Sequence, residues 1–144
     1  MSPTMSSTVM HHEFQVISTA EHVRPARHET AKVLAEWGIS KRVVDTACLI
    51  ISELVTNVVR HAAVLSPTAT VTLAVDDAAM VLSVADAHPL KPKPLLAPHS
   101  VGGRGLFMVN ALVREVHGRA EVLSDTGTGG KRIVIHLPLA PVAT

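Results

Sequence analysis

Residues 53–61 read Glu-Leu-Val-Thr-Asn-Val-Val-Arg-His and place an acid, an amide and two basic side chains inside an apolar run of helical length. The surrounding apolar residues recur at spacings of three and four, which is typical of a helix with one buried face. Glu53, Asn57 and Arg60 stand at i, i+4 and i+7, so they form a second line along the same helix, here called the polar stripe. The apolar positions are Val43, Ala47, Ile50, Ile51, Leu54, Val55, Val58 and Ala62.

The polar stripe has two interpretations. Apolar residues flank it on both sides, so we expect part of it to border the core, where a carboxylate needs a partner or a chemical task. Charged residues are mostly exposed, however, and a solvated helix face with an incidental charge pair gives the same pattern. The stripe alone is compatible with both, so the rest of the chain has to decide between a site and a solvated face.

Composition excludes several classes of function. A chain of 144 residues fits one domain with a substantial core. Its formal net charge is +1 and its basic residues are scattered, which argues against electrostatic binding to nucleic acid or to a membrane. Aromatic residues make up only 2% and there is no Tyr, so the platforms on which single-stranded bases stack are missing. We therefore expect neither nucleic acid nor membrane as a partner.

Cellular location and domain limits follow from equally simple signals. The single cysteine, Cys48, can form no intrachain disulfide and lies in the apolar helix, which fits a buried thiol in a reducing compartment. No apolar run reaches the roughly 20 residues of a membrane span, and no signal-peptide pattern opens the chain. We expect a soluble cytoplasmic protein with a domain at 13–139 and disordered tails at 1–12 and 140–144.

Strand and helix signals precede the helix of the polar stripe. Residues 13–18 alternate well enough for a short strand. A helix with Pro25 in its first turn follows, with Ser18 or Thr19 as its cap, and Gly38 stands just after its end. Ser40 then opens the helix that holds the stripe.

The second half of the chain predicts two hairpins around a proline-rich segment and a further helix. Residues 86–101 hold four prolines, which exclude a regular element and favour a lid or a linker. Antiparallel strand pairs with helices grouped between them predict an α+β two-layer sandwich, with a mostly antiparallel sheet and helices on one face. The expected elements are strands at 68–75 and 80–85, a helix at 106–116, and strands at 120–124 and 132–137.

A glycine-rich junction leads into the helix at 106–116. Its residues are Gly102-Gly103-Arg104-Gly105. Free backbone N–H groups and the positive end of the helix dipole suit such a junction to phosphate oxygens. It is neither a Walker motif nor a dinucleotide fingerprint, and the chain has no zinc-ligand spacing and no Gly-x-Ser-x-Gly elbow.

Taken in order, these features resemble the Bergerat-type (GHKL) ATP-binding fold shared by gyrase, histidine kinases and MutL, over roughly residues 14–139. Within that superfamily the chain is most similar to the stand-alone anti-sigma-factor serine kinases and related ATP-binding regulators of actinobacteria. Residues 53–62 resemble their N-box and residues 103–106 their second glycine box. Asp86 with Pro89 resembles the adenine-reading box, and residues 129–134 resemble the closing box, both more loosely.

The resemblance implies a role for each matching residue. Asn57 corresponds to the Mg²⁺ ligand that bridges the ATP phosphates, and Glu53 to the general base that accepts the proton of a substrate hydroxyl or of a water. Asp86 corresponds to the acceptor of the adenine amine. The further cofactor-binding positions implied in this way are Arg60, His61, Gly103, Arg104, Gly105, Leu106 and Thr128.

Two departures from the family pattern stand near the adenine site. Ala87 and His88 follow Asp86 where the wider superfamily favours a glycine pair. Arg132 occupies the place where a threonine commonly follows Gly-Lys, and Thr128 is the candidate substitute for it. Loss of that hydroxyl removes one hydrogen bond, worth about 0.5–1.5 kcal/mol, so we expect weaker ATP binding and not its abolition.

The resemblance implies an ATP- and Mg²⁺-dependent anti-sigma factor that binds a sigma factor and phosphorylates a serine or threonine of a STAS-type antagonist, with homodimerisation as a family trait. Three alternatives stay open. The chain could be a partner-binding module in which ATP only sets the conformation, a detached ATPase domain of a histidine kinase, or a degenerate fold without nucleotide. The retained Glu53 favours catalysis.

Overall fold

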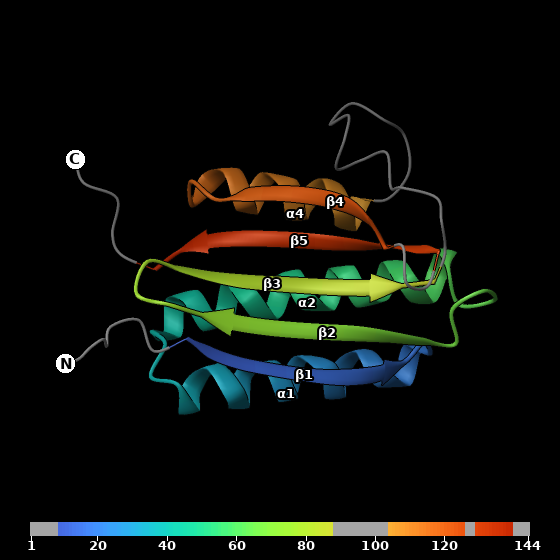
Figure 1. Cartoon of the computed structure of the whole chain (residues 1–144), viewed down its shortest axis with the longest axis horizontal. Helices are drawn as coiled ribbons and strands as arrows, with labels where there is room; N and C mark the ends of the chain where they lie inside the picture. The colour runs from blue at the N-terminus through green and yellow to red at the C-terminus, as the bar shows by residue number, and fades with distance from the viewer. Residues whose placement is uncertain (1–8, 88–103, 126–128, 140–144) are drawn as a thin grey trace.

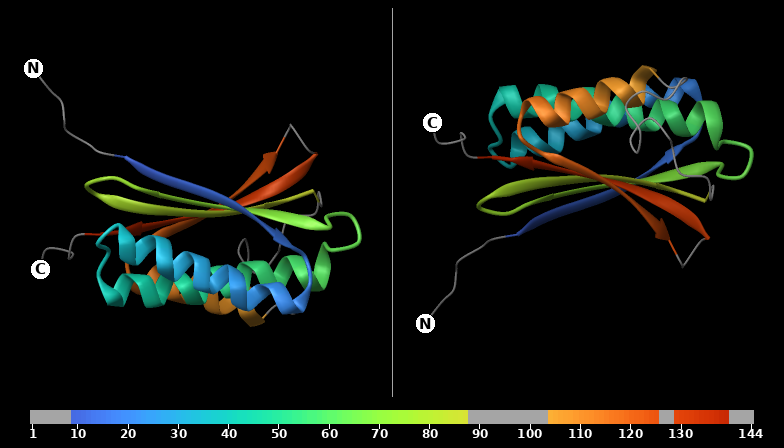
Figure 2. Two further views of the ribbon diagram at one scale, coloured as in Figure 1. Left: turned by 90° about the horizontal axis from the view of Figure 1, so that it is seen from below. Right: turned by 90° about the horizontal axis from the view of Figure 1, so that it is seen from above.

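A five-stranded antiparallel sheet in the order β1-β2-β3-β5-β4 carries the helices on one of its faces (Figures 1 and 2). The computed structural model describes residues 9–87, 104–125 and 129–139. Its strands are β1 (Met10–Ile17), β2 (Thr68–Val75), β3 (Ala79–Asp86), β4 (Arg119–Asp125) and β5 (Gly130–Pro138), and its helices are η1 (Ala20–His22), α1 (Val23–Glu36), α2 (Lys41–His61) and α4 (Arg104–Glu115). This arrangement confirms the expected α+β two-layer sandwich.

The central pairing of the sheet joins strands that are distant in the sequence. β3 pairs with β5, so the end of β3 meets the start of β5 and Asp86 stands opposite Lys131. The hairpins β2–β3 and β4–β5 flank this pairing, and β1 and β4 form the two edges. Residues separated by the whole of α4 thus become direct neighbours.

The core lies between the sheet and α2. The helix buries its apolar side completely, with Ile50, Ile51, Leu54 and Val55 at 0% exposure. They pack in one cluster with the alternate residues of the central strands that point toward the helices. α1 and α4 pack on either flank of α2, as the order of the three helices in Figure 1 shows. The predicted buried face of this helix is therefore confirmed.

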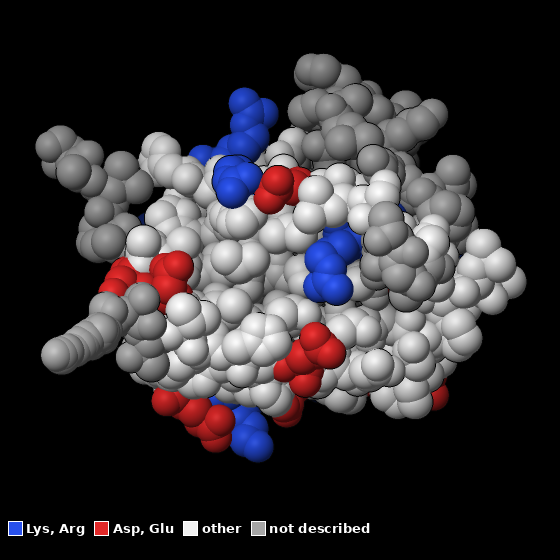
Figure 3. All heavy atoms as spheres, viewed as in Figure 1, with Lys and Arg blue, Asp and Glu red and all other residues white. Residues whose placement is uncertain are grey.

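Within the described part of the chain no helix covers the other face of the sheet, and Figure 3 looks onto this face. Uncharged side chains dominate this face, and most of the Lys, Arg, Asp and Glu side chains lie toward its rim. Alternation along β5 places Arg132 here, where its guanidinium donates to the Ser83 hydroxyl at 2.8 Å. The Arg132 side chain is thus on the opposite face from Asp86, its near neighbour in register.

Element boundaries differ from the expected ones at a few places. β1 begins at Met10, inside the segment that we assigned to the tail, because residues 10–12 pair with residues 73–75 of β2. The predicted cap at Ser18 or Thr19 is wrong for α1, since the turn η1 intervenes and His22 precedes the helix. The Thr19 hydroxyl instead lies 2.6 Å from Nδ1 of His22. Gly38 has the positive φ of 78° expected after a helix end.

One sequence expectation falls almost wholly outside the described residues, and the bounds of one helix differ slightly from those expected. The proline-rich segment lies almost entirely in the undescribed range 88–103. α4 begins at Arg104, before the expected start at 106, and ends at Glu115. Within the residues that the structure describes, no helix is long and apolar enough to span a membrane.

Candidate functional site

Three of the predicted features meet at one end of the molecule. The end of α2, the end of β3 and the start of α4 lie on the same side in Figure 1. β3 ends in Asp86, α2 carries the polar stripe in its second half, and α4 opens with the backbone of the glycine box. The fold therefore brings the polar stripe, Asp86 and the glycine box to one end of the molecule, although they are spread over more than fifty positions of the sequence.

The polar stripe lies on the flank of α2 that is turned away from α1. Cys48 marks the α1 flank, because its Sγ lies 3.7 Å from the carbonyl oxygen of Arg27. Five helical positions rotate the side chain by about 140°, so Glu53 lies on the other flank, toward α4. Glu53 is half-buried, whereas the Asn57 side chain belongs to a residue that is only 9% exposed. Part of the stripe, Glu53 and Asn57, thus borders the core as expected, whereas Arg60 at its end is exposed.

Two members of the stripe, Glu53 and Asn57, have side chains that make no hydrogen bond with the described part of the protein. None of the hydrogen bonds among the described residues involves the side chain of Glu53 or Asn57. A nearly buried amide is costly without hydrogen bonds, so it suits a bound group that supplies them. Arg60 and His61 follow at the end of α2, and both side chains are exposed.

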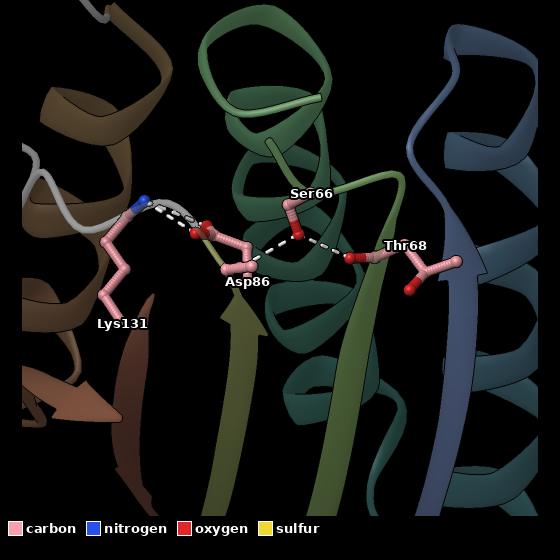
Figure 4. Close-up of polar contacts among 5 residues, drawn as sticks. Ser66, Thr68, Asp86 and Lys131 are labelled. Atoms are coloured by element: carbon pink, nitrogen blue, oxygen red, sulfur yellow. Dashed lines mark hydrogen bonds and ion pairs between the residues drawn. The ribbon is translucent and has the colours of Figure 1, made fainter. Parts of the chain in front are cut away.

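Asp86 is buried at the end of β3 and is paired with a lysine. Its carboxylate oxygens both lie 3.0 Å from Nζ of Lys131, and the side chains of Asp86 and Lys131 are only 2% and 4% exposed (Figure 4). A buried carboxylate of this kind is a strong hydrogen-bond acceptor. It points to the helix-covered side of the sheet, where the polar stripe also lies, because Asp86 alternates with core residues Val84 and Leu82.

The backbone around Asp86 is held from two sides. The Ser66 hydroxyl accepts the Ala87 N–H at 2.9 Å and donates to the Thr68 carbonyl at 2.7 Å, which ties the end of β3 to the loop after α2 (Figure 4). On the other side Gly130 comes so close that a Cβ there would meet the Asp86 carbonyl oxygen and lie 2.5 Å from the Ala87 Cα. Only glycine fits this approach of two strands.

Lys131, Ser66 and Gly130 hold Asp86 or the backbone beside it, and the sequence alone assigns a site role to none of them. Lys131 and Gly130 belong to the stretch that resembles the closing box, but no local pattern pairs them with Asp86. The signal lies in the register of β3 against β5, which is a long-range contact. Ser66 stands in the short connection between α2 and β2 and carries no motif of its own.

Several predicted positions fall outside the described side chains. Gly103 and Thr128 lie outside the described residues, and of Arg104, Gly105 and Leu106 only the backbone is described, in the first turn of α4. Among the described residues no group of three His, Cys, Asp or Glu could hold a metal ion. Mg²⁺ bound mainly through phosphates needs only one or two protein oxygens, for which the Asn57 amide is suited.

A separate cavity of about 470 Å³ lies at the other end of the strands. It is bounded by the start of α2, the end of α4 and the end of β5, so it is distant from Asp86 in the fold. Its lining includes Arg42, Glu115 and His117. This cavity does not belong to the candidate site.

The comparisons with known proteins agree with this arrangement. Residues 16–135 match the model of the histidine kinase-like ATPase domain, and the chain belongs to this family. The expected Bergerat-type resemblance is thereby confirmed, and the chain is an ATP-binding domain of the kinase-like ATPase class. No curated protein sequence matches it significantly.

Solved structures share the fold at low sequence identity. The structure of the RsbU and RsbW domains of Rv1364c from Mycobacterium tuberculosis is 24% identical with a TM-score of 0.65, over 94% of this chain and 35% of that one. The SiaB–SiaC complex from Pseudomonas aeruginosa gives 15% identity and a TM-score of 0.54, over 88% and 89%. The mycobacterial sensor histidine kinase MprB gives 21% and 0.53, over 69% and 76%. The chain thus spans about a third of the Rv1364c chain.

Proposed function

We propose that the protein binds ATP with Mg²⁺ and transfers the γ-phosphoryl group to a serine or threonine of a partner protein. The observation that carries this proposal is the placement of the half-buried Glu53 and the nearly buried Asn57 at the same end of the fold as the buried Asp86. Membership in the kinase-like ATPase family supports the nucleotide. An acid, an amide and a second acid then have three separate tasks.

Each task follows from the chemistry of the side chain. Asp86 would accept the exocyclic amine of adenine, and the Asn57 amide oxygen would hold Mg²⁺ against the phosphates. Bound Mg²⁺ neutralises charge on the phosphoryl oxygens. Glu53 would take the proton of the acceptor hydroxyl. The hydroxyl oxygen would form a bond to the γ-phosphorus while the bond from this phosphorus to ADP breaks, and ADP leaves. The residues of the first turn of α4 would offer backbone N–H groups to the phosphates.

The partner proposal rests on the resemblance of residues 53–62 and 103–106 to anti-sigma-factor serine kinases. We propose that the protein is an anti-sigma factor that binds a sigma factor and phosphorylates a STAS-type antagonist. The structural similarity to a chain with an RsbW domain and to the SiaB–SiaC complex supports a protein substrate. Homodimerisation stays a prediction, for which sedimentation equilibrium is the test.

Calorimetric titration of ATP in the presence and absence of Mg²⁺ tests the first step. We expect binding by the unmodified protein that weakens when Mg²⁺ is removed, and Asn57→Ala should lose this dependence on Mg²⁺. If the unmodified protein gives no heat and no other sign of binding, the nucleotide proposal fails, and with it the kinase.

Single-turnover transfer of radiolabelled γ-phosphate to a purified STAS-type antagonist tests the chemistry. Glu53→Gln keeps the shape of the side chain and should bind ATP normally, while transfer falls by roughly 10²–10⁴-fold, the usual contribution of a general base. Glu36→Gln, at an exposed position of α1, is the matched control and should transfer at the parent rate. Full transfer by Glu53→Gln would remove Glu53 as the base.

The same experiment separates the alternatives. ATP binding without transfer by the unmodified protein would favour the partner-binding module. A phosphorylated product that is stable in acid is a phosphoserine or phosphothreonine, whereas loss of the label in acid would indicate a phosphohistidine and the histidine-kinase alternative.

A further inference from the structure

Lys131 is the closest described partner of the carboxylate that we propose to read adenine. Its Nζ lies 3.0 Å from each carboxylate oxygen of Asp86, and both side chains are almost completely buried. The register of β3 and β5 sets the two residues opposite each other, and the absence of a side chain at Gly130 lets the two strands approach closely there. The fold therefore holds the ammonium group of Lys131 against the carboxylate of Asp86.

Stability alone does not explain this ion pair. Burying two charges costs several kcal/mol per ion in desolvation, and well-packed apolar residues of similar size are often as stable or more so. An exposed pair of the same kind, Lys41 with Asp45 at 2.9 Å, shows that the chain also carries ion pairs without this penalty. A buried pair at the end of β3 thus indicates a task beyond holding the two strands together.

The hydrogen-bonding character of Asp86 decides which base it can recognise. Adenine presents an amine, a hydrogen-bond donor, where guanine presents a carbonyl oxygen, an acceptor. An ionised carboxylate only accepts hydrogen bonds, whereas a protonated carboxyl group also donates one. Lys131 contacts both carboxylate oxygens of Asp86 and so fixes the position of this acceptor. A group that fixes the acceptor in this way helps the site to select adenine.

We propose that Lys131 is a positioning residue that holds the Asp86 carboxylate as a fixed acceptor and thereby sets the preference for ATP over GTP. This inference rests on the proposed function, since it needs Asp86 in contact with the base. Lys131 acts through Asp86 and takes no part in phosphoryl transfer. Ser66 and Gly130 fix the backbone of the acceptor, and Lys131 fixes the orientation of its carboxylate.

The test compares Lys131→Met with the parent protein by calorimetry against three ligands. These are ATP, GTP and the triphosphate of purine riboside, which lacks the exocyclic amine. The parent should bind ATP at least roughly tenfold more tightly than either other ligand, as expected for a hydrogen bond to a charged group. Lys131→Met should bind all three with affinities within about threefold of one another, because the fixed acceptor is lost.

Two further variants keep the result interpretable. Lys131→Arg restores a cation that can bridge a carboxylate and should recover the ATP preference, which a general packing defect would not do. Lys41→Met removes the same charge from the exposed pair with Asp45 and should leave the preference unchanged. If Lys131→Met does not fold, Lys131→Gln takes its place, because its shorter, uncharged amide cannot bridge both carboxylate oxygens of Asp86, and its affinities for ATP and GTP should also lie within about threefold of each other.

The outcomes distinguish this inference from the proposed function. A folded Lys131→Met protein, or a folded Lys131→Gln protein, that keeps the parent preference for ATP overturns the role of Lys131 and leaves the kinase proposal intact. A parent protein that binds no nucleotide overturns both. Loss of the preference in Lys131→Met with recovery in Lys131→Arg supports the inference.

Discussion

Replacement of Gly130 by alanine tests the close contact between β3 and β5 on which the site depends. The added methyl group would meet the carbonyl oxygen of Asp86 and lie 2.5 Å from the Cα of Ala87. Carbon atoms in contact normally stay about 3.5–4.0 Å apart, so the two strands must separate by about 1 Å. Both obstacles are main-chain atoms at the end of a central strand, and neither can rotate out of the way.

The expected cost follows from this geometry. Overpacking costs typically 1–3 kcal/mol, and we expect about 3 kcal/mol here because no side chain can yield. For a protein of this size each kcal/mol lowers Tm by about 2–4 °C, which gives a fall of about 10 °C. Since the displaced strand carries Asp86, the affinity for ATP should fall at least tenfold in the protein that remains folded.

Urea unfolding and calorimetric titration with ATP measure the two effects, and Gly38→Ala is the control. Gly38 has a φ of 78°, and a methyl group added there would have nothing within 4 Å, so the control suffers only the backbone penalty of about 1–2 kcal/mol. It should bind ATP like the parent protein. If Gly130→Ala loses no more stability than Gly38→Ala and binds ATP normally, the strand contact does not position Asp86 and the reasoning is wrong.

Three further predictions concern single polar groups. Ser66→Ala leaves the Ala87 N–H without its acceptor and should cost about 1–3 kcal/mol in urea unfolding; an unchanged midpoint would contradict this role. Burial raises the pKa of the Cys48 thiol, so iodoacetamide should modify it slowly in the native protein and quickly in urea, and equal rates would show that it is accessible. The hydrogen bond from His136 lowers the pKa of Glu121, so its stabilising contribution is present above the unfolded pKa and is lost as the pH falls through the lower folded value. Glu121→Gln should therefore be less stable than the parent at pH 7 and equally stable in acid below that range, as thermal unfolding across pH would show; a constant difference would refute it.

Local patterns were sufficient to predict most of the elements. The spacing of apolar residues in α2 has the period of a helix, and the alternation in β2 and β3 has the period of a strand. These elements can therefore be predicted from short stretches of sequence. The burial of Asn57 followed from its place beside the apolar face of α2. The start of α1 was missed because Thr19 has the chemistry of a cap but bonds to the ring of His22 instead.

The environment of Asp86 could not be predicted in the same way. Its partner Lys131 lies 45 positions further along the chain and is reached only through the pairing of β3 with β5. Each of the two hairpins is specified by its own turn, but nothing local specifies which strand of one hairpin lies beside the other. The position of Arg132 depended on the same pairing, which turns it to the uncovered face and leaves Lys131 on the side of the site.

The separation of β3 from β5 in the sequence also has a consequence for folding. Helices α1 and α2 and the hairpin of β2 and β3 are built from neighbouring segments, whereas β5 can join only after the intervening chain has closed a long loop. Until then β3 is an unpaired strand edge, which is prone to associate with other chains. We expect the β3–β5 pairing to form late during refolding. The same step would then place Asp86 beside Lys131 in the candidate site and remove the exposed strand edge.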